Sequence, residues 1–292
     1  MRSTLNRLMA TRSSSAVPVA VAMLAMSATV AMPVTSGHAQ EQSTRRTNWH
    51  GAVGAVAGSL ESYYGTDARR TLGAPLIGIA YKDRLLFGTT TSGGLGGGLE
   101  FVLRRGTVGA SLGVTGVEPR PEERADGLAG MDDRSGALFG TVGLVVRGGP
   151  AEATATTAVG LRQDAGVAQT LGLEVGKPIL PRLTASIGGV VTFADRKNIM
   201  FDFGVTEEQA ARRRELIAGG DGRLRASDTT AYSPKAGVKE VRGTLQMTYA
   251  LHGSWQAIAF VSVGQLPDRV SESPLARKRR AVATAVGMTY GF

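Results

Sequence analysis

A serine between two glycines is the first feature of this sequence that could do chemistry. The stretch "GASLG", Gly109–Gly113, matches the G-x-S-x-G pattern in which Ser111 would attack an ester or amide carbonyl. Such a nucleophile must stand on a sharp turn from a strand into a helix. Ser111 instead lies in a run of alternating apolar and small residues, with no helical pattern after it. We interpret it as a small strand residue and expect no catalytic residue here.

Carboxylates, glycines and histidines supply the other candidates for a reactive or metal-binding site. The acidic pairs Glu122–Glu123 and Asp132–Asp133 fall in one loop rich in Pro, Arg and Gly. Carboxylates do acid–base work when a cleft desolvates them, so this loop is interpreted as solvated, with at most a weak divalent-cation contact. The glycine-rich stretch at 93–101 lacks the Gly-Lys-Ser/Thr of a phosphate loop. With no cysteine and three histidines, the sequence predicts neither a metal site nor a cofactor.

The first 39 residues predict a cleaved secretory signal. Three arginines and no acid precede an apolar stretch from Ala16 to Val34. The small residues Gly37 and Ala39 then predict a peptidase site after Ala39. A membrane-spanning anchor is the alternative, which the prolines and hydroxyl residues of the stretch disfavour. We therefore expect residues 40–292 to work outside the cytoplasm.

The rest of the chain repeats a period of two residues, which is the pattern of β-strands. In "RLTASIGGVVTF", residues 182–193, apolar residues alternate with Thr, Ser and Gly. Twelve such segments begin near Trp49, Gly73, Arg84, Gly97, Thr107, Gly136, Ala151, Gly166, Arg182, Gly237, Ser254 and Ala281. Many have the roughly 9–11 residues that cross a bilayer as a tilted strand. The pattern predicts an all-β, antiparallel up-and-down transmembrane barrel of 12 strands, or 10 if the region 73–91 does not span.

The lengths of the connections distinguish this barrel from a water-soluble β-sandwich. Alternate connections are tight, such as Arg105–Gly106 and His252–Gly253, whereas the others include the long stretches 118–134, 195–236 and 267–280. Short periplasmic turns and long outer loops are typical of bacterial barrels. A sandwich has no reason to sort its loops in this way. The small residues of each strand would then face a narrow polar lumen, and the larger apolar residues would face lipid.

Aromatic residues predict two girdles at the membrane surfaces, where amphipathic rings prefer to lie. The inner girdle would contain Trp49, Tyr81, Tyr249, Trp255, Tyr290 and Phe292. The outer girdle would contain Tyr63, Tyr64, Phe193, Phe201 and Phe203.

The chain ends in "AVATAVGMTYGF", a strand pattern that runs to the last residue. Its apolar residues Val286, Met288, Tyr290 and Phe292 alternate with small ones and would face lipid. The strand must also close the barrel, because an open sheet edge is not stable in hydrocarbon. These four residues are similar to the C-terminal signal that the barrel-assembly machinery recognises, so we expect that machinery to be a partner.

One stretch of the longest loop predicts a helix. In "TEEQAARRREL", residues 206–216, Thr206 can cap the first turn and Gln209 can complete a capping box. Acids stand at its start and arginines near its end, as the helix dipole favours.

The densest basic run could bind phosphate groups, since arginine forms paired hydrogen bonds with them. Two interpretations of the run remain open: a contact with lipopolysaccharide through Arg277, Lys278, Arg279 and Arg280, or a solvated loop end. Aromatic residues do not interleave with it, so we expect no nucleic-acid partner.

Several of these stretches together resemble the MipA/OmpV family of outer-membrane proteins. They are "FGVTEEQAARR" (203–213), "AYSPKAGVKEV" (231–241), "YALHGSWQ" (249–256), "ESPLA" (272–276) and the final "GMTYGF". The resemblance covers about residues 120–292, and "RELIAGGDGRLRASD" (214–228) departs from the family pattern.

The resemblance implies a barrel in the bacterial outer membrane, with outer-membrane lipid and lipopolysaccharide around it. It further implies a scaffold that joins a lytic transglycosylase to a penicillin-binding protein during murein remodelling. The leading hypothesis is therefore a non-enzymatic structural or scaffold protein of the cell envelope. A narrow diffusion pore, a surface adhesin or antigen, and a lipid-modifying enzyme that uses Ser111 are the alternatives.

Overall fold

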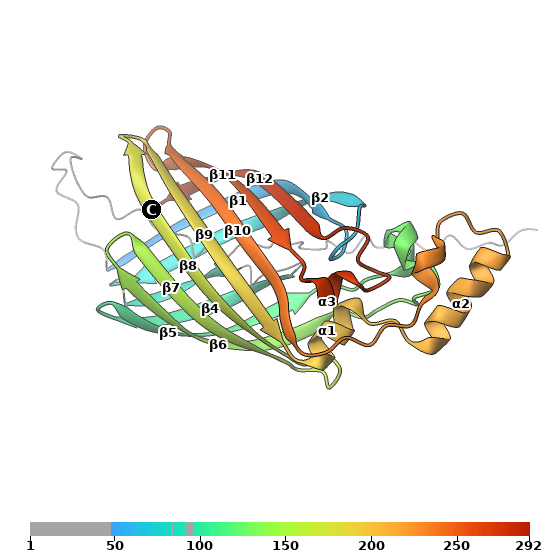
Figure 1. The fold of residues 1–292 in the computed structure, drawn as a ribbon. Coiled ribbons are helices and arrows are strands. Elements are labelled where there is room, and N and C mark those ends of the chain that lie inside the picture. The colour runs from blue at the N-terminus through green and yellow to red at the C-terminus, as the bar shows by residue number, and fades with distance from the viewer. Residues whose placement is uncertain (1–47, 83, 91–95) are drawn as a thin grey trace, which may run out of the picture.

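The computed structural model describes residues 48–82, 84–90 and 96–292, and these form a closed barrel of twelve antiparallel strands in sequential order (Figure 1). The predicted signal at 1–39 lies outside the described residues. The strands are β1 Trp49–Glu61, β2 Arg69–Tyr81, β3 Leu85–Thr90, β4 Gly96–Arg105, β5 Val108–Val117, β6 Ala137–Gly148, β7 Ala151–Gly160, β8 Val167–Leu180, β9 Leu183–Ala194, β10 Gly237–Ala250, β11 Trp255–Gln265 and β12 Arg280–Gly291. Strand β12 pairs with β1 and closes the sheet.

The prediction of twelve strands is confirmed and the alternative of ten is wrong. Strand β2 begins four residues before the expected start at Gly73, and β3 follows it. β2 pairs with β1 over its whole length, from Glu61↔Arg69 to Trp49↔Tyr81. The region 73–91 therefore contributes two strands of the wall.

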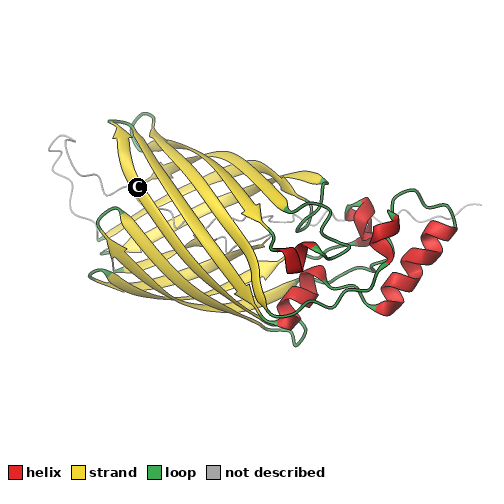
Figure 2. Ribbon diagram, viewed as in Figure 1, coloured by secondary structure: helices red, strands yellow, loops and turns green. Residues whose placement is uncertain are grey.

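The sorting of loop lengths is also confirmed. The connections β4–β5, β6–β7 and β8–β9 are tight turns, while β5–β6, β9–β10 and β11–β12 are long. Three tight turns place a glycine in the left-handed region: Gly106 (φ 64°), Gly149 (φ 57°) and Gly253 (φ 60°). Glycine adopts this conformation without the steric cost of a Cβ atom. The turn residues thus fix the register at what we call the inner end, while the long loops gather at the opposite, outer end (Figure 2).

Side-chain alternation separates the two faces of the wall. On β5, Leu112 is 66% exposed on the outside, whereas its neighbour Ser111 is 5% exposed and faces the lumen. On β12, Val286, Met288, Tyr290 and Phe292 all lie on the outer, exposed face. The C-terminal residue also joins β1, because the Phe292 N–H donates to the Gly51 carbonyl at 2.9 Å.

The long loops contain three α-helices, where the sequence predicted one. The predicted helix is α2, Glu207–Ala218, and its capping box between Thr206 and Gln209 is present. Helix α1, Arg196–Phe203, and the short α3, Asp268–Ser271, were not predicted. Within the described residues, no helix has the length and apolar character needed to cross a membrane.

Candidate functional site

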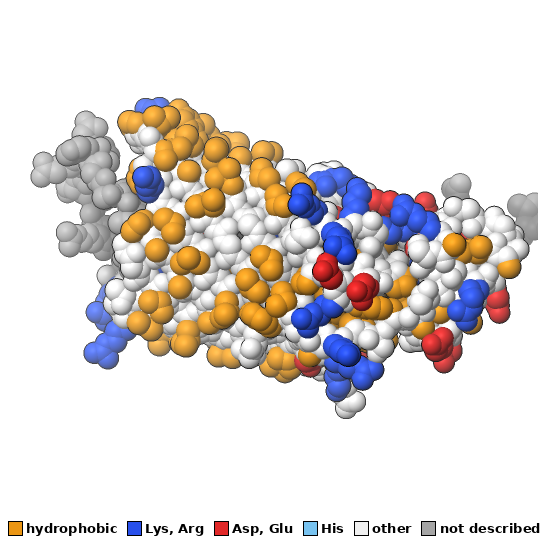
Figure 3. Space-filling model, viewed as in Figure 1, with side chains coloured by type: hydrophobic (Ala, Val, Ile, Leu, Met, Phe, Trp, Pro, Cys, Tyr) orange, Lys and Arg blue, Asp and Glu red, His pale blue; other side chains and the backbone are white. Residues whose placement is uncertain are grey.

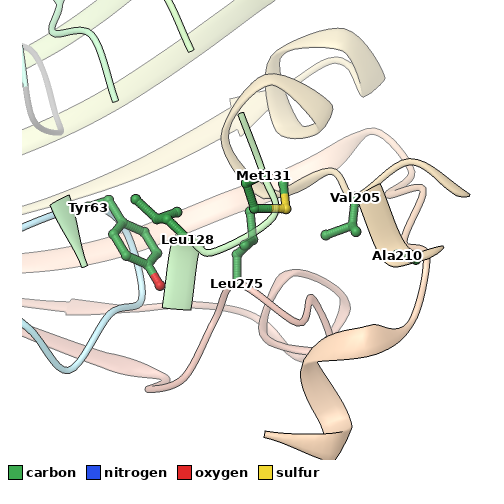
Figure 4. Packing of buried hydrophobic residues seen from close by; sticks show 6 residues of the cluster. All are labelled: Tyr63, Leu128, Met131, Val205, Ala210 and Leu275. Atoms are coloured by element: carbon green, nitrogen blue, oxygen red, sulfur yellow. The ribbon is translucent and has the colours of Figure 1, made fainter. Parts of the chain in front are cut away.

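The outer loops pack into a small folded body, which we call the cap. Its hydrophobic core consists of Tyr63, Leu128, Met131, Val205, Ala210 and Leu275 (Figure 4). These residues come from the β1–β2, β5–β6, β9–β10 and β11–β12 connections, so segments far apart in sequence meet here. Leu128, Ala210 and Leu275 have no exposed surface. The cap is therefore held by its own core and is more than a set of solvated loops.

Helix α1 joins the cap to the mouth of the barrel. Asp195 caps it by accepting from the Asn198 N–H at 2.7 Å. The helix buries Ile199 and Phe203 completely, against Ala194 at the end of β9 and Leu266 and Val270 after β11. This packing places the carboxylate-bearing turn of α1 over the outer end of the lumen.

Asp202 of α1 is the centre of a buried ion cluster. Its Oδ2 accepts from Lys239 Nζ at 2.6 Å and its Oδ1 from Arg134 Nη1 at 2.7 Å. Arg120 Nη1 donates to the Asp202 carbonyl at 2.8 Å, and Lys239 Nζ also donates to Asn198 Oδ1 at 2.7 Å. Each of the two charged partners thus donates to a different carboxylate oxygen, as a buried ion pair requires.

The electrostatics of this cluster favour the ionised carboxylate. Burial alone would raise the pKa of the Asp202 carboxyl, but the charges of Lys239 and Arg134 lower it well below its usual range. Burial lowers the pKa of the Arg120 guanidinium to about 10, and the charge of Arg134 acts in the same direction. The Asp202 carboxylate and the Arg120 guanidinium therefore both remain charged at neutral pH.

The cluster crosses the mouth of the barrel. Arg120 and Arg134 lie in the β5–β6 connection, whereas Lys239 belongs to β10, which is four strands from β6 and five from β5 in a ring of twelve. A second link joins β2 to the same connection, where Arg70 pairs with Glu118 at 2.7 Å. Contacts between nearly opposite parts of the wall hold the cap across the outer mouth.

A second ion cluster lies deeper in the cap and includes the first residue of the basic run. Arg277 Nη2 donates to Asp228 Oδ2 at 2.6 Å, and the fully buried Arg213 lies 3.8 Å from the same oxygen. The other three run residues, Lys278, Arg279 and Arg280, are exposed. Lipopolysaccharide contact stays a prediction for the run, and Arg277 lies in an internal ion pair.

The lumen has two different walls, which corrects part of the sequence-based expectation. Strands β5 to β9 present polar residues such as Ser111, Thr141 and Thr192, as expected. Strands β1, β2, β11 and β12 instead present an apolar cluster formed by Val56, Leu60, Ala74, Phe260 and Ala285. Ser262 of β11 and Thr289 of β12 are also buried on this side, so the expected polar lumen is wrong around the apolar cluster and holds beside it.

The residues considered for catalysis or metal binding lie in a strand or take part in hydrogen bonds and ion pairs within the loops. Ser111 lies in the middle of β5, which continues to Val117 without a turn into a helix. In the acidic pairs, Glu122 Oε1 accepts from the Gly130 N–H at 2.8 Å, and Asp132 pairs with Arg212. Within the described ranges, no group of three or more His, Asp and Glu side chains could hold a metal ion.

The inner end carries an aromatic girdle, as predicted. Trp49 lies 4.7 Å from Tyr81 and Trp255 lies 5.2 Å from Tyr290, measured between ring centroids. The predicted outer girdle is mostly wrong. Tyr63, Phe201 and Phe203 are buried in the cap and at the mouth, and Tyr64 is half-buried against Phe203, which leaves Phe193 as its exposed member.

The inner turns also carry exposed cations, which we call the inner basic ring. Its members are Lys82, Arg84, Arg105, Lys177 and Arg182. The turns that carry them lie at the end of the barrel away from the cap (Figure 1). This ring and the cap are the two surfaces on which a function can be placed.

Sequence reasoning missed the cluster around Asp202, although one signal pointed towards it. The lysine of "AGVKEV" interrupts the apolar pattern at the outer start of β10, where Lys239 turns out to be buried. A buried cation requires a partner, but nothing in the sequence identifies Asp202 or Arg134 as that partner.

The barrel is similar to several solved structures of outer-membrane proteins. The NanC porin is 8% identical with a TM-score of 0.42, covering 81% of this chain and 98% of that one. The outer-membrane expressed OmpT of Vibrio cholerae is 9% identical with a TM-score of 0.36, covering 84% and 97%. The KdgM porin in complex with disordered oligogalacturonate is 8% identical with a TM-score of 0.37, covering 82% and 99%. The barrel architecture itself follows from the strand pairing described above.

A comparison with curated proteins found no match. The model of one protein family, described as MltA-interacting protein MipA, matches residues 53–292. This range contains nearly all of the wall and the whole cap. The chain is therefore an outer-membrane β-barrel protein and belongs to the MipA family.

Proposed function

We propose that this barrel is a non-enzymatic scaffold of the cell envelope that docks murein-remodelling enzymes on its inner, periplasmic end. The observation that carries the proposal is the family match over residues 53–292, because the family is described by its interaction with MltA. A lytic transglycosylase is the expected first partner and a penicillin-binding protein the second.

The geometry supports the inner basic ring as the docking surface. A murein enzyme works in the periplasm, which is the side of the short turns in bacterial barrels. Five exposed cations lie there beside exposed rings such as Trp49 and Trp255. Aromatic and arginine side chains are enriched among the residues that dominate protein interfaces. An acidic surface on the partner would complement this ring, and charge complementarity would speed its association.

The test is crosslinking in intact envelopes, followed by affinity purification of the tagged protein and mass spectrometry. The wild type is expected to recover a lytic transglycosylase or a penicillin-binding protein. The variant with Arg84→Glu, Arg105→Glu and Arg182→Glu should lose that recovery, because it reverses the charge of the docking surface.

A control variant reverses the charge of two arginines on the cap. Arg212→Glu and Arg225→Glu change exposed side chains at the outer end, where each wild-type arginine pairs with an aspartate, Asp132 or Asp67. This variant should recover the partner as the wild type does. Absence of murein enzymes from the wild-type sample, with other envelope complexes crosslinked in it, would refute the scaffold function.

A narrow diffusion pore is the second candidate, favoured by the polar wall of β5 to β9. Its lumen carries charged side chains, among them Glu152, which pairs with Arg147 and lies 4.0 Å from Arg104. The cap argues against it, because the Asp202 cluster crosses the outer mouth. Steady single-channel conductance of the pure wild-type protein would favour the pore over the scaffold.

A further inference from the structure

The lipid-facing wall has a groove where the barrel closes. It has a volume of about 350 Å³ and crosses β10, β11, β12 and β1. The small residues Ala57, Ser59 and Ala259 form its floor between larger ones such as Met247 and Val286. A depression of this kind on a wall that faces hydrocarbon fits an apolar chain.

The outer end of the groove coincides with an unpaired part of the closing seam. The ladder between β1 and β12 stops at Ser59↔Thr284, although β12 begins four residues earlier, at Arg280. Both Ser59 and Thr284 line the groove. Beyond this point the edge of β12 needs other donors, because unpaired backbone groups are costly next to lipid.

Arg69 supplies a donor at this place. Its Nη1 donates to the Val282 carbonyl at 2.9 Å, its Nε to Ser59 Oγ at 3.1 Å and its Nη2 to the Ser59 carbonyl at 3.1 Å. Since a guanidinium has five N–H groups, two remain for another acceptor. The bonds hold an exposed cation flat against the outside of the seam.

Two more cations lie near this end of the seam. Arg280 is two residues from Val282 on β12, and Lys278 precedes it. Among the described residues, no carboxylate oxygen lies within 4.0 Å of a side-chain nitrogen of Arg69, Lys278 or Arg280. Glu61, opposite Arg69 in the ladder, accepts from the Gly65 N–H at 3.0 Å, and Arg280 Nε donates to Gln265 Oε1 at 3.2 Å. In this part of the chain, the three cations therefore have no carboxylate at salt-bridge distance.

The height of these groups fits the surface of the outer leaflet. Tyr290 of the inner girdle and Arg280 are ten residues apart on β12. At about 3.3 Å per residue and a tilt of about 40°, this separation is about 25 Å, which is the height of the apolar band of such barrels. Thr284 then lies roughly 10 Å below the outer edge of the band. Figure 3 shows Lys and Arg side chains gathered where the apolar wall meets the cap.

We propose that the seam is a binding site for lipopolysaccharide, with a lipid A phosphate on Arg69, Arg280 and Lys278 and an acyl chain in the groove. The charge of the cations and the apolar lining of the groove select a lipid with an anionic headgroup. Because the cations lie at the height of the outer leaflet, we expect the bound lipid to be lipopolysaccharide. This site uses the last part of the basic run but not Arg277, which pairs with Asp228.

The test measures binding of purified lipids to the folded protein by native mass spectrometry. The probes are bisphosphorylated lipid A, the same lipid without phosphates, and phosphatidylglycerol. Because the phosphates of bisphosphorylated lipid A accept charge-assisted hydrogen bonds, this lipid should bind about tenfold or more tightly than the form without phosphates. It should also bind more tightly than phosphatidylglycerol, which carries a single phosphate charge. Arg69→Gln should remove most of this difference, whereas Arg105→Gln, at the inner end, should leave it unchanged.

Arg69 also supports the seam, so a second variant keeps the test decisive if Arg69→Gln does not fold. The double variant Lys278→Gln with Arg280→Gln leaves the hydrogen bonds of Arg69 intact. It should weaken the binding of phosphorylated lipid A by about tenfold. Ala57→Leu fills the groove and should weaken the binding of both forms of lipid A. Equal binding of all three probes, or equal losses in the inner-end control, would overturn the site. Tight binding of phosphatidylglycerol that depends on the same cations would overturn the commitment to lipopolysaccharide.

Discussion

The two ends of this barrel are built on different principles. The inner end has tight turns, and glycines such as Gly106 and Gly253 determine their shape through local backbone conformation. The outer end has a cap whose hydrophobic core and ion clusters join four connections, among them 118–136 and 195–236. Local chemistry specifies the inner end, whereas contacts between distant segments specify the outer end.

This difference explains where each end can work. Turns of a few residues leave the inner surface open, and the cations of the inner basic ring are exposed on it, with Lys82 Nζ 5.2 Å from the centre of the Tyr81 ring. The cap uses many of its charges internally, as Asp202 and Arg213 illustrate. We therefore propose partner binding at the inner end and closure of the lumen at the outer end.

Asp202→Asn should have the largest effect, because it should destabilise the cap without unfolding the barrel. The change leaves the buried Lys239 and the partly buried Arg134 beside each other without the Asp202 charge, and breaking a buried pair costs about 3–5 kcal/mol. The cap should detach while the barrel stays folded. Hydrogen exchange should accelerate across α1 and remain slow in β6 and β8. The exposed Asp221, which pairs with Arg223, provides the control Asp221→Asn, and equal exchange in both variants would contradict the account.

Leu275→Ala should loosen the core of the cap rather than its anchor. Leu275 has no exposed surface, and such a truncation costs about 2–5 kcal/mol. Limited proteolysis should cut within 214–228 faster than in the wild type. The exposed Leu112 on the lipid-facing side of β5 is the matched control, because Leu112→Ala removes the same atoms outside the cap. Faster cleavage in the control as well would place the weakness in the barrel.

Gly253→Ala should affect the inner end alone. Gly253 has a φ of 60°, and a residue with a Cβ atom loses roughly 1–2 kcal/mol in that conformation. Because open space surrounds the position, strain of the backbone is the expected cause. Exchange should rise at the ends of β10 and β11, and proteolysis of the cap should not change. Altered proteolysis of the cap would show that the two ends are coupled.

Acid should have the smallest effect over most of the pH range. The pKa of Asp202 is lowered in the folded protein, so its stabilising contribution is complete above the unfolded value of about 3.9 and is lost as the pH falls below it. A label on α2, introduced as Arg212→Cys in this cysteine-free chain, should report an unchanged cap between about pH 5 and 8. Opening of the cap within that range would mean that other groups hold it.

The sequence allowed the wall to be predicted because each strand and turn is specified locally. Alternation and loop length located all twelve strands, and a capping box located α2. Helix α1 was missed because "RKNIMFDF" has no apolar period of its own and is ordered by contacts with β8 and β9. The buried role of Tyr63 and Phe203 was missed for a related reason. An aromatic residue near a strand end fits a girdle and a cap equally well until the loops are placed.

Single-channel recording on the purified wild-type protein in a planar bilayer tests the central claim most directly. The claim is that the cap closes the outer mouth through the cluster around Asp202. The account predicts that the wild type shows no sustained conductance at neutral pH and that Asp202→Asn, with its cap detached, shows discrete openings. Steady conductance of the wild type, unchanged by Asp202→Asn, would contradict it.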